Sequence, residues 1–158
     1  MMGGSIKIFQ KINNIFRESW ATEHLAAVYL MQHDWEEAIQ ALNHSIALNP
    51  TSGFSHSSLA LCYRLVKNNE RYEKEFKIAE NLLMREGVGS YDLACLEAIR
   101  GDKEKAFILL ENALENDLPI RRFFKDDPHL IELKSERRFS GLVMKYTEFS
   151  DINIYPWT

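Results

Sequence analysis

The sequence contains few residues that break helices, with seven glycines and four prolines among 158 residues. Sandwiches and barrels of short strands need more turn residues than this. Collagen-like and disordered chains are also excluded, because hydrophobic residues make up 46% and charged residues 27% of the chain. The composition therefore predicts an all-α fold.

Long apolar runs and an excess of basic residues are also missing. No stretch approaches the roughly 18 consecutive apolar residues that a membrane span requires, and no basic flank followed by an apolar run marks a signal peptide. A formal net charge of -4 argues against nucleic acid as a partner. We therefore expect a cytoplasmic protein without a membrane span, in which Cys62 and Cys95 are buried free thiols.

Signals of catalysis and of metal binding are absent from the sequence. No nucleophile stands near a base in a recognisable motif, and Gly87-Val88-Gly89 lacks the Lys-Ser/Thr of a nucleotide-binding loop. The histidines lack the spacing of a zinc site; they are His24, His33, His44, His56 and His129. We therefore predict no enzymatic activity, no cofactor and no metal site.

An internal repeat with a period of 34 residues is the main feature that the chain does contain. The dipeptide Leu-Ala recurs at 25–26, 59–60 and 93–94. Polar turns follow at His33-Asp34, Lys67-Asn68-Asn69 and Gly101-Asp102, where Asp or Asn can cap the next helix. Each unit is therefore predicted to be two amphipathic helices, and the three units must stack to bury their apolar faces, as in an α-solenoid.

The 34-residue period and the residues in its columns resemble the tetratricopeptide repeat (TPR). This resemblance implies a right-handed superhelix of three helix pairs within residues 19–120, at about 19–52, 53–86 and 87–120. The chain departs from the family pattern at Glu97, where an aromatic residue is usual, and at Tyr72, where Ala is usual. It also has Met84 and Leu118 where Pro is usual, and the column of the usual early Trp holds Thr22, His56 and Ser90. The bulky ring of Tyr72 is expected to widen the packing in the middle repeat.

Two flanking segments and a tail complete the predicted organisation. In residues 1–18, apolar residues such as Ile6, Phe9 and Ile12 alternate with Lys7 and Lys11, which predicts an amphipathic helix; the first few residues are left out of the fold argument. Residues 121–149 are predicted to form helices that cap the last repeat. Their motif Asp127-Pro128-His129-Leu130 is similar to a segment that follows the last repeat in many bacterial TPR proteins. Residues 150–158 form a tail.

The TPR resemblance also implies where a partner binds, because the first helix of each pair lines the concave surface in that family. The candidate residues by column are Trp20, Glu23, Ala27, Leu30 and Met31, then Phe54, Ser57, Leu61, Arg64 and Leu65, and finally Tyr91, Cys95 and Ile99. This surface is mostly apolar, which suits an amphipathic helix or an extended peptide with hydrophobic anchors.

The sequence therefore predicts a non-catalytic adaptor or scaffold whose partner is a protein or peptide. Three alternatives stay open. The N-terminal helix could fill the groove itself, or the same helix of a second subunit could fill it in a homodimer. The chain could also be a chaperone-like or regulatory subunit of a larger enzyme or secretion complex.

Overall fold

The structure, a computed structural model, describes residues 2–147. The predicted tail at 150–158 and the last two residues of the predicted capping segment lie outside this range. Every regular element in the described range is helical, which confirms the all-α prediction. None of the described helices combines the length and the apolar character needed to cross a membrane. The chain divides into two compact units, Met1–Leu83 and Met84–Thr158.

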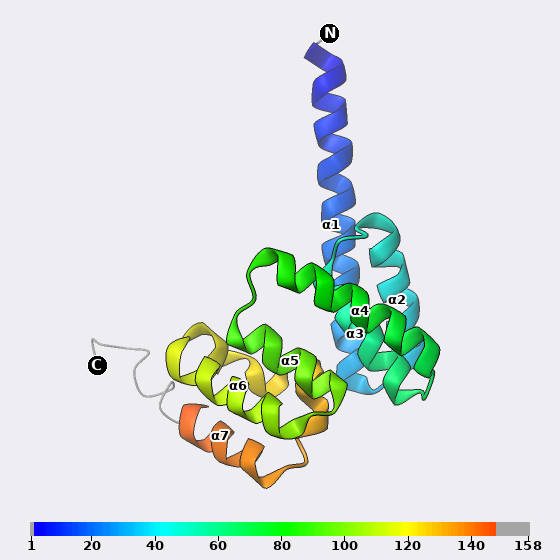
Figure 1. Ribbon diagram of the computed structural model, residues 1–158. Helices are drawn as coiled ribbons and strands as arrows, with labels where there is room; N and C mark the ends of the chain where they lie inside the picture. Colours follow the sequence, from blue (N-terminus) through cyan, green and yellow to red (C-terminus); the bar gives the residue numbers. More distant parts are fainter. Residues whose placement is uncertain (1, 148–158) are drawn as a thin grey trace, which may run out of the picture. The chain divides into compact units, whose positions relative to one another are not determined.

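The first unit consists of helices that pack on one another through small and branched apolar residues. In chain order they are α1 (Met2–Gln32), α2 (Trp35–Leu48), α3 (Gly53–Leu65) and α4 (Asn69–Glu86), which ends just past the unit boundary. α2 lies against both α1 and α3 (Figure 1). The core of this unit contains Ala26, Leu30, Leu42, Leu59 and Cys62. Burial raises the pKa of Cys62 to about 12, so this thiol is protonated at neutral pH.

The second unit is one helix pair covered by an irregular segment and a last helix. Its elements are α5 (Ser90–Arg100), α6 (Lys103–Asn116), the 3-10 turns η1 (Pro119–Arg122), η2 (Phe124–Asp126) and η3 (Pro128–Leu133), and α7 (Arg137–Thr147). η3 packs on α5, and both η1 and α7 pack on α6. Arg138 of α7 forms a two-pronged ion pair with Glu111 of α6, at 2.8 and 3.0 Å. The Arg138 guanidinium lowers the pKa of that carboxyl.

The turn between paired helices has the same backbone conformation at three places, 34 residues apart. The positive φ angles are 64° at His33, 61° at Lys67 and 93° at Gly101. After each of these residues, a backbone N–H donates to the carbonyl five residues earlier, from Asp34 to Tyr29, from Asn68 to Tyr63 and from Asp102 to Glu97, at 2.9, 2.8 and 3.0 Å. This pattern closes a helix with a left-handed residue. The 34-residue period is therefore present in the backbone geometry.

Substitutions at the left-handed position are expected to change the free energy of unfolding in opposite directions at two of these turns. A side chain costs about 1 kcal/mol in this conformation, and glycine avoids the cost. We expect Lys67→Gly to raise the free energy of unfolding by about 0.5 kcal/mol, because the exposed Lys67 has φ 61°, and Gly101→Ala to lower it by about 1 kcal/mol. Urea unfolding followed by circular dichroism measures both, and changes of the same sign would contradict the turn geometry.

Two of the departures from the repeat pattern, Tyr72 and Glu97, have packing partners. The ring of Tyr72 lies 5.6 Å from the ring of Phe76 and packs beside the core of the first unit. The Glu97 side chain is 8% exposed, and its carboxylate accepts a hydrogen bond from Lys105 Nζ at 2.7 Å. An ion pair therefore replaces the usual aromatic contact at this column.

The N-terminal segment differs from its predicted organisation. The predicted boundary after residue 18 falls inside α1, which runs from Met2 to Gln32 with no break there. The physical reason is that Arg17-Glu18-Ser19 contains neither glycine nor proline to end a helix. Residues 6–17 therefore continue the axis of α1, and the apolar side chains Ile6, Phe9 and Phe16 are exposed.

Candidate functional site

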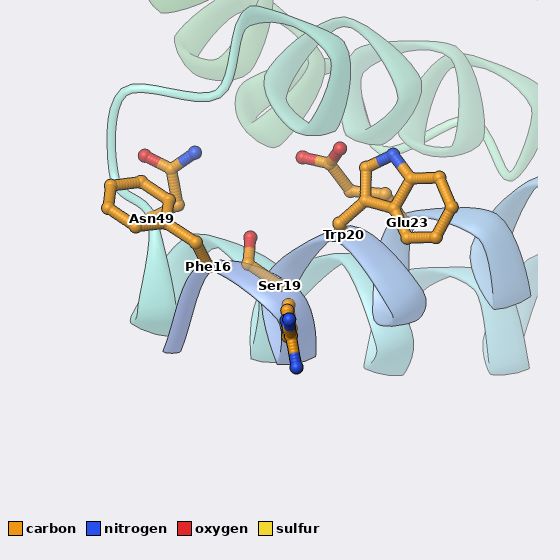
Figure 2. A pocket seen from close by; sticks show the side chains of 6 residues that line it. Phe16, Ser19, Trp20, Glu23 and Asn49 are labelled. Atoms are coloured by element: carbon orange, nitrogen blue, oxygen red, sulfur yellow. The ribbon is translucent and has the colours of Figure 1, made fainter. Parts of the chain in front are cut away.

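A hollow of about 440 Å³ lies beside the middle of α1 in the first unit. Its lining residues are Phe16, Arg17, Ser19, Trp20, Glu23 and Asn49. Five come from α1, and Asn49 follows the end of α2. In Figure 2, the ring of Phe16 lies near Asn49 and the indole of Trp20 lies near Glu23. The hollow therefore combines two aromatic surfaces with a carboxylate and an amide.

The two aromatic side chains of the hollow are largely open to solvent. Trp20 is 64% exposed and Phe16 is 58% exposed. The indole of Trp20 contacts the His24 ring one turn further along α1, with centroids 4.0 Å apart, and His24 Nδ1 is bonded to the Trp20 carbonyl at 2.9 Å. This neighbour restricts the indole, so Trp20 presents a large and partly ordered apolar surface.

A network of serine hydroxyls surrounds the Glu23 carboxylate. Its Oε1 accepts hydrogen bonds from Ser52 Oγ, from Ser55 Oγ at 2.9 Å and from Ser45 Oγ at 3.4 Å. Ser45 Oγ is also 3.1 Å from both Ser19 Oγ and Ser55 Oγ. All four serines are buried. The network ties α1, α2 and the start of α3 together, which fixes the floor of the hollow.

The predicted groove residues in the first unit differ widely in exposure. Trp20 and Met31 are exposed. Partly buried residues are Glu23, Ala27, Phe54, Arg64 and Leu65. The buried ones are Leu30, Ser57 and Leu61. Leu30 belongs to the unit's core, and the Ser57 hydroxyl donates to the Phe54 carbonyl at 3.0 Å. Of the predicted set, the hollow includes Trp20 and Glu23.

The predicted groove residues in the second unit belong to a different environment. Ile99 is fully buried, and Tyr91 and Cys95 take part in a polar cluster with Asp127 and His129. Tyr91 Oη donates to Asp127 Oδ2 at 2.6 Å, and the backbone N–H of His129 donates to Asp127 Oδ1 at 2.8 Å. Asp127 therefore caps η3 and fastens it to α5.

The Cys95, Asp127 and His129 side chains are of the types that bind zinc. One donor atom of each lies within 4.8 Å of the others. Burial raises the pKa of the Cys95 thiol and of the Tyr91 phenol, and the Asp127 carboxylate raises both further. Both groups are therefore protonated at neutral pH, and both Asp127 oxygens already accept hydrogen bonds. In this geometry the cluster holds η3 against α5.

Sequence reasoning missed both polar clusters because no local spacing reveals them. Tyr91 and Asp127 are 36 residues apart, and Glu23 and Ser55 are 32 residues apart. Two members of the clusters carry a recognisable capping signal: Asp127, directly before Pro128 at the start of η3, and Ser52 at the start of α3.

Comparison with protein-family models, with curated proteins and with solved structures finds no match for this chain. The case for a function therefore rests on the repeated turns and on the hollow beside α1.

Proposed function

We propose that this chain is a non-catalytic protein-interaction module of the tetratricopeptide type, which binds a hydrophobic segment of a partner protein over the hollow beside α1. The repeated left-handed turns at His33, Lys67 and Gly101 support the assignment to this repeat type. The observation that carries the binding function is the exposed Trp20 beside Phe16, at the rim of the hollow.

The chemistry of the hollow indicates what kind of segment fits. Large aromatic side chains at the centre of an interface contribute much of its binding energy. An aliphatic or aromatic side chain of the partner would insert between Phe16 and Trp20, while the Asn49 amide offers a donor and an acceptor to its backbone. Arg17 also lines the hollow, and its positive charge favours a partner with an acidic residue next to its hydrophobic anchor.

The hydrogen-bonded floor favours binding of a partner over the alternative in which the chain's own N-terminal helix fills the hollow. The serine network around Glu23 is complete without a ligand, and residues 6–17 continue α1 in a straight line instead of folding back. A preformed hollow loses little conformational entropy when a partner binds.

The proposal predicts that both aromatic residues are needed for binding. Peptides of about 16 residues, long enough for a four-turn helix, would be selected from a displayed random library with the wild-type protein. We expect Phe16→Ala with Trp20→Ala to weaken their binding at least about thirtyfold, because each aromatic anchor contributes about 1 to 2 kcal/mol. Fluorescence anisotropy of labelled peptides measures the dissociation constants.

The matched control is Met144→Ala, which also removes an exposed apolar side chain, from α7. We expect it to leave the affinity unchanged. Equal affinity of the selected peptides for the wild type and the double variant would refute the assignment of the hollow, as would a library that yields no binder.

A further inference from the structure

The first half of α1 extends beyond the helix that packs against it. The contacts between α1 and the last turn of α2 include a bond from His44 Nε2 to Glu18 Oε1 at 2.9 Å and one between the Ser19 and Ser45 hydroxyls. Residues 2–17 precede these contacts, and they form about 24 Å of helix at 1.5 Å per residue. Figure 1 shows this part of α1 standing clear of α2.

This free helix presents an apolar face to solvent. Ile6, Ile8, Phe9 and Ile12 are 57%, 61%, 72% and 44% exposed. At about 100° per residue, Ile8, Phe9 and Ile12 fall within one arc of roughly 100°. A contiguous exposed patch of this kind on a protein surface marks a site of association.

The opposite side of the same helix is basic. Lys7, Lys11 and Arg17 project away from the apolar arc, and residues 1–17 include no Asp or Glu. The segment therefore has a formal charge of +3 although the whole chain has -4, so the remaining residues carry -7. Along the chain, this positive segment is separated from the acidic remainder. Around the helix, Ile6 lies outside the apolar arc and next to Arg17.

We propose that residues 5–17 bind the surface of an anionic lipid bilayer, with Ile8, Phe9 and Ile12 inserted among the acyl chains. Lys7, Lys11 and Arg17 then lie at the level of the lipid headgroups. An amphipathic helix with a basic polar face and Phe or Ile on the other face is the type that lies in a bilayer interface. Residues 5–17 form about 20 Å of helix, which is shorter than the roughly 30 Å hydrocarbon core, so the segment lies along the surface.

Charge complementarity favours an anionic bilayer over pairing with the same helix of a second copy. Pairing of two such helices would bring two segments of charge +3 together, and no acidic residue within them offsets the repulsion. Anionic headgroups attract each basic side chain that lies within a Debye length of the surface.

The test is flotation of the full chain with lipid vesicles. We expect binding to vesicles with about 30 mol% phosphatidylserine to be at least about tenfold stronger than to pure phosphatidylcholine, and to weaken as salt is added. The variant Ile8→Gln, Phe9→Gln, Ile12→Gln should lose this binding at least about tenfold while keeping its helix, because Gln is a good helix former. Lys7→Gln with Lys11→Gln should bind both vesicle types equally weakly.

Two controls distinguish lipid binding by residues 5–17 from nonspecific binding by exposed apolar residues and from peptide binding at the hollow. Ile108→Gln changes an exposed isoleucine on α6 and should leave flotation unchanged. Phe16 and Trp20 are kept in every variant, so peptide binding at the hollow is measured independently. No flotation of the wild type, or equal flotation of the triple variant, would overturn the proposal. So would a wild-type dimer, seen by light scattering, that the triple variant abolishes without any vesicle binding.

Discussion

Phe124→Ala is expected to lower the free energy of unfolding of the second unit by about 3 to 5 kcal/mol. Phe124 is fully buried in the core that the irregular segment forms with α6 and α7. Its ring lies 5.8 Å from that of Phe139, in an edge-on arrangement. Removing the ring leaves a cavity between the irregular segment, α6 and α7, and these elements lose the side chain on which they all pack.

The adjacent residue provides a matched control for this prediction. Phe123 is 47% exposed, and its ring is nearly perpendicular to the Tyr91 ring, with the ring centroids 5.6 Å apart. We expect Phe123→Ala to cost about 1 kcal/mol or less. Urea unfolding measures the difference, and hydrogen exchange resolved by peptide shows whether α5 and α6 lose protection. Equal costs for the two variants would mean that the segment at 119–147 is not part of the core.

The periodic part of the fold was predictable because its causes are local. The polar turns and the capping residues are short local patterns in the sequence. The 34-residue period appears as the regular recurrence of such patterns. The structure has left-handed turns at His33, Lys67 and Gly101, as the turn positions predicted. The Asn68 and Asp102 side chains cap the next helix by accepting from the Arg71 and Lys105 N–H groups, at 3.2 and 3.1 Å. The Asp34 side chain makes no such hydrogen bond, so the capping prediction is wrong at that turn. The period and the turns therefore support a helical repeat, and stacking of all three units stays a prediction.

The polar interior was not predictable, because it depends on residues that are distant in the sequence. Glu23 was assigned to a binding groove from its column, but its carboxylate is bonded to serines of α2 and of the start of α3. Cys95 was assigned in the same way, and it lies near Asp127 and His129. A column assigns a helix face, but which side chains meet there is decided by tertiary packing.

The second large effect on stability is expected from breaking a buried ion pair in the first unit. His56 of α3 and Glu75 of α4 have side chains that are 7% and 14% exposed, and His56 Nδ1 lies 2.6 Å from Glu75 Oε2. The other ring nitrogen lies 2.9 Å from the Pro50 carbonyl oxygen. A ring with two acceptors is doubly protonated, because each nitrogen then donates a hydrogen bond.

The pKa of His56 is set by opposing effects. Burial lowers it, and the Lys74 charge lowers it slightly. The hydrogen bond to Glu75, the bond to the Pro50 carbonyl and the Glu75 charge raise it, and the net pKa is above the ordinary 6.5. The charged pair therefore stabilises the fold fully below pH 6.5, and its contribution is lost as the pH rises through the folded-state value.

Glu75→Ala is accordingly expected to cost about 3 kcal/mol near pH 6, because it leaves a buried charged ring without its carboxylate. Once the pH exceeds the folded-state pKa of His56, the neutral ring loses only one hydrogen bond, so the cost should fall towards about 1 kcal/mol as the pH is raised to 9. Urea unfolding at the two pH values measures this difference. Glu73→Ala changes an exposed glutamate on the same helix and should cost less than about 0.5 kcal/mol at both. A cost of Glu75→Ala that is already near 1 kcal/mol at pH 6 would show that His56 is not charged in the folded protein.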